Sequence, residues 1–147
     1  MLDRRRGRKL NTASFAGLAG APAMMTYGVS KAAVVALSEQ LRAEVHGSGV
    51  SVSVACPSFF QTKLLENWRG SERMKGFADK MMSGGKDKLD DVADKIFAAT
   101  ERGDFLILPT RNSPKYWRMK RWFPEKYFRK LVEAVAKRAK RTEPAKS

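Results

Sequence analysis

Residues 11–31, NTASFAGLAGAPAMMTYGVSK, contain the pattern that decides the fold and the chemistry of this chain. The hydroxyl of Ser14 stands thirteen residues before the phenol of Tyr27, and the ammonium of Lys31 follows Tyr27 by four residues. Residues four apart on a helix lie on the same face, so the side chains of Tyr27 and Lys31 can approach one point. The sequence therefore predicts a proton-transfer site in this stretch.

These three residue types suit the interconversion of an alcohol and a carbonyl. A phenol has an ordinary pKa of about 10 and is a poor acid or base at neutral pH, but a nearby positive charge favours the phenolate. Lys31 can supply that charge. A hydroxyl at the end of a strand, such as that of Ser14, can donate a hydrogen bond to a substrate oxygen as negative charge builds on it.

The same stretch resembles the catalytic region of the short-chain dehydrogenase/reductase family. The family pattern is a strand that ends in N-x-x-S, a loop with glycine and proline, and Y-x-x-x-K on the next helix. Asn11 and Ser14 match the strand end, and Tyr27 and Lys31 match the helix motif. The resemblance implies hydride transfer between NAD or NADP and a carbonyl or secondary alcohol. Its implied catalytic residues are Tyr27 as the acid/base, Lys31 on the nicotinamide ribose and Ser14 on the substrate oxygen.

A second segment, residues 57–62 (PSFFQT), is similar to the family's P-G-x-x-x-T loop beside the nicotinamide, although Ser58 stands where the family usually has glycine. The resemblance implies these cofactor contacts: Tyr27, Lys31, Pro57, Phe59 and Thr62. The implied substrate contacts are Ser14, Phe60 and Leu64. The large apolar residues between 59 and 85 either line a site for a bulky apolar ketone or alcohol, such as a lipid or a steroid-like compound, or belong to the core.

A Tyr-x-x-x-Lys pair is weak evidence by itself, because Tyr116 and Lys120 have the same spacing. The residue thirteen positions before Tyr116 is Gly103, which has no hydroxyl. Tyr27 alone combines the preceding serine, the strand end and the later P-x-x-x-x-T. We therefore prefer the pair at Tyr27 as the catalytic one.

The alternation of predicted strands and helices indicates an α/β fold followed by a basic helical tail, and the resemblance implies that this fold is the C-terminal portion of a Rossmann-like doubly wound parallel sheet. Apolar residues at three- and four-residue steps predict helices at 26–46 and 87–102. Runs of β-branched and apolar residues predict strands at 50–56 and 104–109. In the family the helix corresponding to 26–46 also packs against its copy in a partner subunit, so the resemblance implies a homo-oligomer.

The N-terminal residues 1–10 carry five basic residues and one acidic residue and lack the apolar run of a buried parallel strand. They are either a disordered basic arm or the sign of an aberrant start inside a longer gene, and we prefer the second interpretation. No G-x-G-x-x-G segment, which would meet the cofactor pyrophosphate, occurs in the chain. We therefore expect a truncated form, with residues 11–110 as the catalytic half of the domain.

The net charge of +14 lies in the two ends, because residues 11–110 hold eleven basic and eleven acidic residues. The tail, residues 111–147, carries thirteen basic and three acidic residues around an apolar stripe. It can lie on an anionic membrane surface, pack over the substrate loop or a partner subunit, or bind nucleic acid, which we favour least. The alternative function is a catalytically inactive remnant that acts through this tail.

The single cysteine, Cys56, excludes an intrachain disulfide and a Cys-based metal site. No apolar run approaches the length of about 20 residues that spans a bilayer. We therefore expect a cytoplasmic protein without a metal, acting on a small-molecule substrate and peripheral to the membrane if the tail binds lipid.

Overall fold

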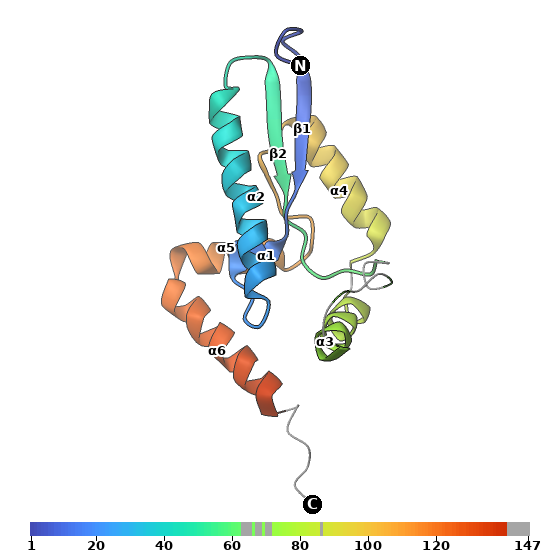
Figure 1. The fold of residues 1–147 in the computed structure, drawn as a ribbon, viewed down its shortest axis with the longest axis vertical. Helices are drawn as coiled ribbons and strands as arrows, with labels where there is room; N and C mark the ends of the chain where they lie inside the picture. The colour runs from blue at the N-terminus through green and yellow to red at the C-terminus, as the bar shows by residue number, and fades with distance from the viewer. Residues whose placement is uncertain (63–65, 67–68, 70–71, 86, 141–147) are drawn as a thin grey trace, which may run out of the picture.

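A three-stranded parallel sheet with helices on both faces forms the body of the protein (Figure 1). The computed structural model of the 147-residue chain describes residues 1–62, 66, 69, 72–85 and 87–140. The strands are β1 (Gly7–Thr12), β2 (Val50–Ala55) and β3 (Leu106–Ile107), in the order β1-β2-β3. The predicted α/β class and parallel sheet are therefore confirmed.

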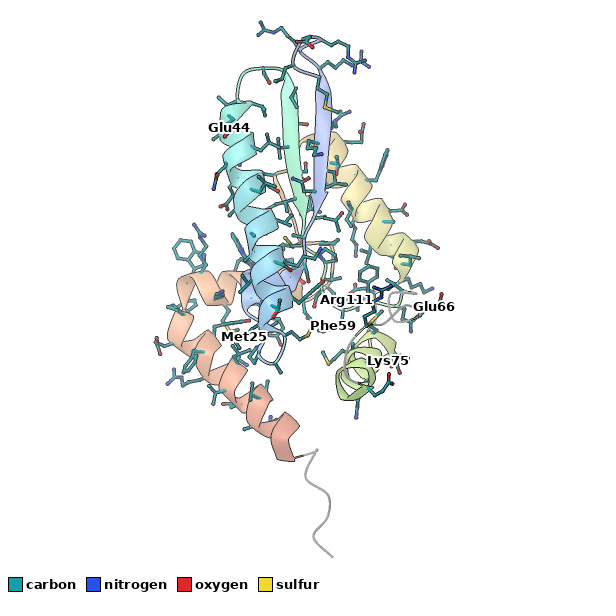
Figure 2. The ribbon with its side chains drawn as sticks, in the orientation of Figure 1. Met25, Glu44, Phe59, Glu66, Lys75 and Arg111 are labelled. Carbon is teal, nitrogen blue, oxygen red and sulfur yellow. The ribbon has the colours of Figure 1, made fainter. Side chains whose placement is uncertain are left out.

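Six helices are described around this sheet. Their bounds are α1 (Phe15–Ala19), α2 (Met25–Glu44), α3 (Glu72–Ser83), α4 (Leu89–Arg102), α5 (Ser113–Trp122) and α6 (Pro124–Lys140). The helices predicted at 26–46 and 87–102 correspond to α2 and α4. Figure 2 shows α2 running from Met25, at the end of the sheet where β1 and β2 stop, back to Glu44 near the start of β2.

The two faces of β2 carry separate apolar cores. Adjacent residues of a strand point to opposite faces, and Val54 and Ala55 do so here. Val54 packs in a cluster with Val35 of α2, whereas Ala55 packs with Ala99 of α4. Both strand residues are fully buried, so β2 is the central element of the sheet.

The first strand begins inside residues 1–10, the segment for which the sequence suggested either a basic arm or an aberrant start. Gly7 pairs with Val50 and the register continues to Thr12 opposite Ala55. The apolar-run rule applies to strands buried on both faces, whereas the residues of β1 are mostly exposed. Arg8 instead forms an ion pair with Glu101 at 3.1 Å, so charged residues are compatible with this strand.

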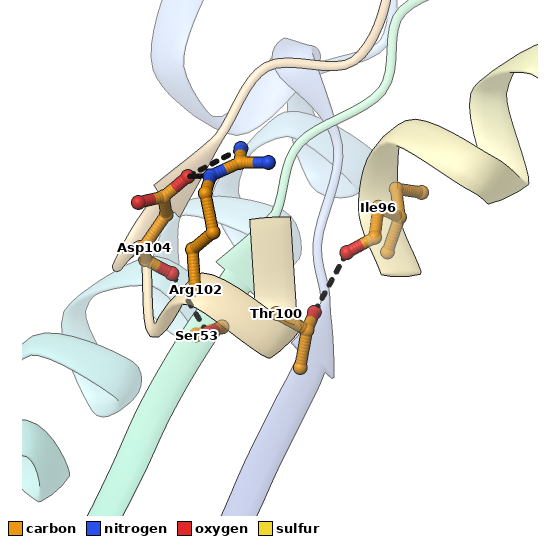
Figure 3. A network of polar contacts seen from close by, with 5 residues as sticks. All are labelled: Ser53, Ile96, Thr100, Arg102 and Asp104. Carbon is orange, nitrogen blue, oxygen red and sulfur yellow. Dashed lines mark hydrogen bonds and ion pairs between the residues drawn. The ribbon is translucent and has the colours of Figure 1, made fainter. Parts of the chain in front are cut away.

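The third strand is shorter than the predicted 104–109 because its start belongs to the end of α4. Gly103 ends that helix with a left-handed φ of 78°, and the Asp104 amide donates to the Ala99 carbonyl at 3.0 Å. The Ser53 hydroxyl of β2 donates to the Asp104 carbonyl at 2.7 Å, and Arg102 pairs with the Asp104 carboxylate at 2.7 Å (Figure 3). This network ties the turn to the central strand.

The tail forms two helices that are joined to the body at α1. Proline stands in the first turn of α5 and at the first position of α6, as the sequence predicts. The Lys120 ammonium donates to the carbonyl of Leu18, and the Tyr127 hydroxyl donates to the carbonyl of Ala19 at 3.0 Å. In Figure 1, α6 then runs away from the sheet.

The short helix α1 lies against the backbone of α2 at a glycine. A Cβ atom added to Gly17 would lie 2.6 Å from the carbonyl carbon of Lys31 and 2.7 Å from the amide nitrogen of Ala32. Real Cβ atoms do not come this close to backbone atoms. Gly17 is therefore required for the approach of α1 to the turn of α2 that carries Lys31.

Replacing Gly17 with alanine should destabilise the fold by about 1–3 kcal/mol, the usual cost of overpacking a close contact. The matched control is Gly28→Ala on the facing helix, where the added Cβ would meet its nearest neighbour, the Ala16 carbonyl oxygen, at an ordinary 3.6 Å. Alanine is the better helix former, so the control should match or exceed the wild-type stability. Urea unfolding measures both, and equal stability of Gly17→Ala and wild type would contradict the required close approach.

Candidate active site

The candidate residues lie at the carboxyl ends of β1 and β2. There β1 passes into α1, α2 begins, and β2 passes into the segment that starts at Cys56. Ligands of open parallel sheets bind at this edge, because the loops that follow the strands meet there. The site therefore has the position that an α/β enzyme normally uses.

The first candidate, Ser14, is the N-terminal cap of α1. Its Oγ accepts a hydrogen bond from the Ala16 amide at 3.2 Å, which satisfies one of the free amides of the first helical turn. The same hydroxyl donates to the Pro57 carbonyl at 3.5 Å, while the Phe15 amide reaches that carbonyl at 2.8 Å. The contact made by the Ser14 hydrogen is the longer and weaker one, so this hydrogen can turn toward a substrate oxygen at little cost.

The second and third candidates, Tyr27 and Lys31, lie one turn apart on α2. The Lys31 Nζ donates to the carbonyl of Thr12 at 3.4 Å and is 5.8 Å from the centre of the Tyr27 ring. Tyr27 is 38% exposed, so solvent and ligands can reach it. The Thr12 carbonyl is two residues before Ser14, and it therefore holds the ammonium beside the end of β1.

The buried thiol of Cys56 lies close to both Ser14 and Lys31. Burial raises the pKa of Cys56 from an ordinary 9.0 to about 12, and a hydrogen bond from the Ser14 backbone and the charge of Lys31 partly oppose this rise. A thiol with so high a pKa is neutral and unreactive at physiological pH. The hydrogen bond from the Ser14 backbone places the start of α1 next to the end of β2.

The side-chain amide of Asn11, near the end of β1, does not point toward the other candidate residues but toward α2. Its Nδ2 donates to the Oγ of Ser38 at 3.0 Å, and the buried Ser38 hydroxyl in turn donates to the Val34 carbonyl at 2.6 Å. Ser38 is seven residues beyond Lys31, about two helical turns. Asn11 thus fastens β1 to α2 and acts on the site by positioning these elements.

The loop 57–62 is held by residues that follow β3. The Ser58 amide donates to Oγ1 of Thr110 at 3.1 Å, and the Thr110 and Ser113 hydroxyls are 2.5 Å apart. A Cβ on Gly85 would lie 3.4 Å from the Phe59 carbonyl oxygen, so the chain before α4 also packs on this loop. Figure 2 shows Phe59 and Met25 at the same end of the sheet.

The remaining loop residues are placed only in part. Pro57, Phe59, Phe60 and Thr62 are all half-buried, whereas Leu64 lies outside the residues that the structure describes. The roles of these residues toward a cofactor or a substrate stay predictions. The structure brings the loop to the same sheet edge as Ser14 through the Pro57 carbonyl.

Several residues that shape the site had no role in it predicted from the sequence. Thr110 lies 52 residues from Ser58, so no local pattern connects them. Lys120, which belongs to the second Tyr-x-x-x-Lys pair, binds the carbonyl of Leu18 at the end of α1. From the sequence, Gly17 could be recognised only as a small residue in the loop. Its contact with the Lys31 backbone is seen only in the structure.

Two classes of site are not found in the described part of the chain. Within it, no group of three or more His, Cys, Asp or Glu side chains is arranged to hold a metal ion. Of the helices described, none combines the length and the apolar composition needed to cross a membrane.

Comparison with known proteins identifies the relatives of this chain. Residues 1–73 match a family model described as short chain dehydrogenase. The matched range includes β1 and the candidate residues Ser14, Tyr27 and Lys31. A relative from Xanthobacter autotrophicus, "Inactive 2-(S)-hydroxypropyl-CoM dehydrogenase 2", is 51% identical over 57 residues. That match covers 39% of this chain and 25% of the relative.

Solved structures extend the similarity over most of the chain. A short chain dehydrogenase/reductase from Burkholderia phymatum in complex with NAD is 27% identical, with a TM-score of 0.74 over 85% of this chain and 50% of that one. A short chain dehydrogenase from Burkholderia cenocepacia in complex with NADP is 20% identical, with a TM-score of 0.69 over 89% of this chain and 49% of that one. The chain thus spans about half the length of these structures.

The geometry around Cys56 predicts that its thiol resists modification in the folded protein. Because burial raises its pKa to about 12, the thiolate fraction near pH 8 falls about a thousandfold relative to an ordinary thiol. Alkylation by iodoacetamide, followed by mass spectrometry, should therefore be slower by about that factor in buffer than in concentrated urea. Equal rates in the two conditions would show that the end of β2 is open to solvent.

Proposed function

Because the chain belongs to the short-chain dehydrogenase/reductase family, a family of oxidoreductases, we propose that its site interconverts a secondary alcohol and a ketone or aldehyde with NAD or NADP. The observation that carries this proposal is the position of the Lys31 ammonium. It is held by the Thr12 carbonyl at 3.4 Å, on the same helix face as Tyr27 and beside the strand end that leads to Ser14.

Each of the three residues has a distinct role in the proposed reaction. The Tyr27 hydroxyl gives a proton to the carbonyl oxygen during reduction, or takes one from the alcohol during oxidation. Lys31 supplies the positive charge that favours the phenolate form. The Ser14 hydroxyl leaves its long contact with Pro57 and donates to the same substrate oxygen, where negative charge develops.

The residues at this edge fit the nicotinamide end of such a cofactor. A lysine ammonium has three donors, and the contact with Thr12 uses one of them, so Lys31 can also reach ribose hydroxyls together with Tyr27. Pro57, Phe59 and Thr62 belong to the loop beside this position, which the Thr110 hydroxyl steadies through Ser58. When bound, the nicotinamide supplies or accepts the hydride.

The substrate of the proposed reaction is a bulky apolar ketone or alcohol. This preference is supported by apolar side chains at the same end of the molecule, where Met25 is 78% exposed and Phe59 and Phe60 are half-buried. Apolar side chains with a few convergent polar groups are typical of small-molecule sites. Leu64 belongs to the same proposed contact set, outside the described residues.

The outward face of α2 supports a homo-oligomer. Val29, Ala33, Ala36 and Leu37 recur at helical spacing and are exposed, with Val29 at 70% and Leu37 at 60%. Small and apolar residues on one face allow two helices to approach closely. We therefore include a partner copy of this chain, packed through α2, in the proposed assembly.

A second candidate function is a catalytically inactive chain that acts through its basic tail. It is favoured by the relative from Xanthobacter autotrophicus, which is 51% identical over 57 residues and is itself described as inactive. In this alternative the site at the sheet edge is retained as a scaffold. The two candidates differ in whether the folded chain turns over any alcohol or carbonyl.

Replacing Tyr27 with phenylalanine should lower kcat/KM by at least about a hundredfold in either direction, because the acid/base hydroxyl is lost while the ring remains. The assay is the change in NAD(P)H absorbance with a panel of bulky ketones and secondary alcohols. Tyr116→Phe is the matched control, since it removes the same hydroxyl from the second Tyr-x-x-x-Lys pair. The control should keep wild-type kinetics.

Two results would contradict the proposed catalysis. If Tyr27→Phe kept full activity, the proton transfer would not involve this phenol. If the wild-type chain were folded by circular dichroism but neither bound NAD(H) or NADP(H) nor turned over any substrate, the inactive alternative would be supported instead.

A further inference from the structure

The apolar stripe of helix α6 is only partly covered by the protein. Tyr127 and Leu131, four residues apart, are half-buried, and Tyr127 contacts α1 through the carbonyl of Ala19. Phe128, Val132 and Val135 follow one another at helical spacing beside them and are 58%, 49% and 44% exposed. A monomeric protein rarely leaves such a continuous apolar row in water without a partner for it.

Two hydrogen bonds oppose a rotation of α6 that would cover this row. The Tyr127 hydroxyl donates to the Ala19 carbonyl at 3.0 Å, and just before α6 the Lys120 ammonium binds the Leu18 carbonyl. These bonds satisfy carbonyls at the C-terminal end of α1, which have no partner within their own helix. They therefore fix which side of the stripe faces the protein and which side remains open.

The surroundings of the open row are strongly basic and contain exposed aromatic residues. The tail carries thirteen basic and three acidic residues, whereas residues 11–110 are neutral overall. Arg129 and Lys130 directly follow Phe128, and Lys126 precedes it, all of them exposed. At the junction of α5 and α6, Trp122 is 73% exposed and Phe123 is 63% exposed. Tryptophan with lysine and arginine around an apolar row is the composition of interfacial helices.

We propose that α5 and α6, residues 113–140, bind peripherally to an anionic lipid surface, with Phe128, Val132 and Val135 facing the acyl boundary and the basic residues facing the headgroups. Nucleic acid would account for the charge but would leave the apolar row in water. A second copy would bring two like-charged tails together, which disfavours association. An anionic bilayer complements both the charge and the apolar row.

Binding in this orientation would place the lipid surface beside α1. Lys120 of α5 binds the carbonyl of Leu18 and Tyr127 of α6 binds the carbonyl of Ala19, both in the segment between Ser14 and Tyr27. If the chain acts on an apolar alcohol or ketone, as proposed above, that substrate would reach the site from the lipid phase. Lipid binding itself does not depend on this activity.

The test is flotation of the full chain with vesicles of equal parts phosphatidylglycerol and phosphatidylcholine, compared with pure phosphatidylcholine. We expect binding to the anionic vesicles only, and a steep loss of binding as salt is raised, because exposed charges are screened. The variant Val132→Glu should lower the partition coefficient at least about tenfold, since it puts a carboxylate into the lipid-facing row.

The matched control is Phe97→Glu on α4, which makes the same kind of change at a residue that is 69% exposed and far along the chain from the tail. It should bind vesicles as the wild type does, and circular dichroism checks that both variants fold. The proposal would be overturned if the chain bound neutral and anionic vesicles equally or bound neither. It would also be overturned if Val132→Glu and Phe97→Glu lost vesicle binding to the same extent. The proposal would also be overturned in favour of nucleic acid if the chain bound a DNA duplex tightly and Val132→Glu left that binding unchanged. It would be overturned in favour of a second copy if the chain formed a dimer that Val132→Glu abolished.

Discussion

The close approach of α1 to α2 is the constraint on which the candidate site depends. The absence of a side chain at Gly17 lets α1 rest on the backbone of Lys31 and Ala32. That contact sets the turn of α2 that faces the end of β1, so the Lys31 ammonium reaches the Thr12 carbonyl. The geometry of the candidate site thus follows from backbone packing rather than from attraction between the three candidate side chains, which is typical of preorganised sites.

The central strand β2 connects the candidate site to the two apolar cores of the molecule. On one face of β2 the core joins α2, on the other it joins α4, and both cores contain buried β2 residues. Just beyond the strand, Cys56 accepts a hydrogen bond from the Ser14 backbone, and the Pro57 carbonyl accepts hydrogen bonds from the start of α1. A shift of β2 would therefore move the candidate residues and the loop 57–62 together.

Local patterns in the sequence predicted the elements that have a strong periodicity. The sequence predicted α2, α4, β2 and the prolines that begin the tail helices. Its motifs also indicated the family. The end of β1 near Asn11 was expected from the resemblance, but its start at Gly7 was not, because the exposed residues of this strand lack the apolar run of a fully buried strand. The support of Ser58 by Thr110 and of α1 by Lys120 was not readable either, since these contacts join segments 52 and 102 residues apart.

The exposed charges of β1 have a consequence for the behaviour of the chain in concentrated solution. Within the described residues β1 pairs only with β2, which leaves the backbone groups of its other edge available to a strand from another molecule. Such edges promote aggregation when they are flat and apolar, and basic side chains oppose it by repulsion. Arg8 and Lys9 are exposed on this strand, and they make uncontrolled sheet extension between copies unfavourable.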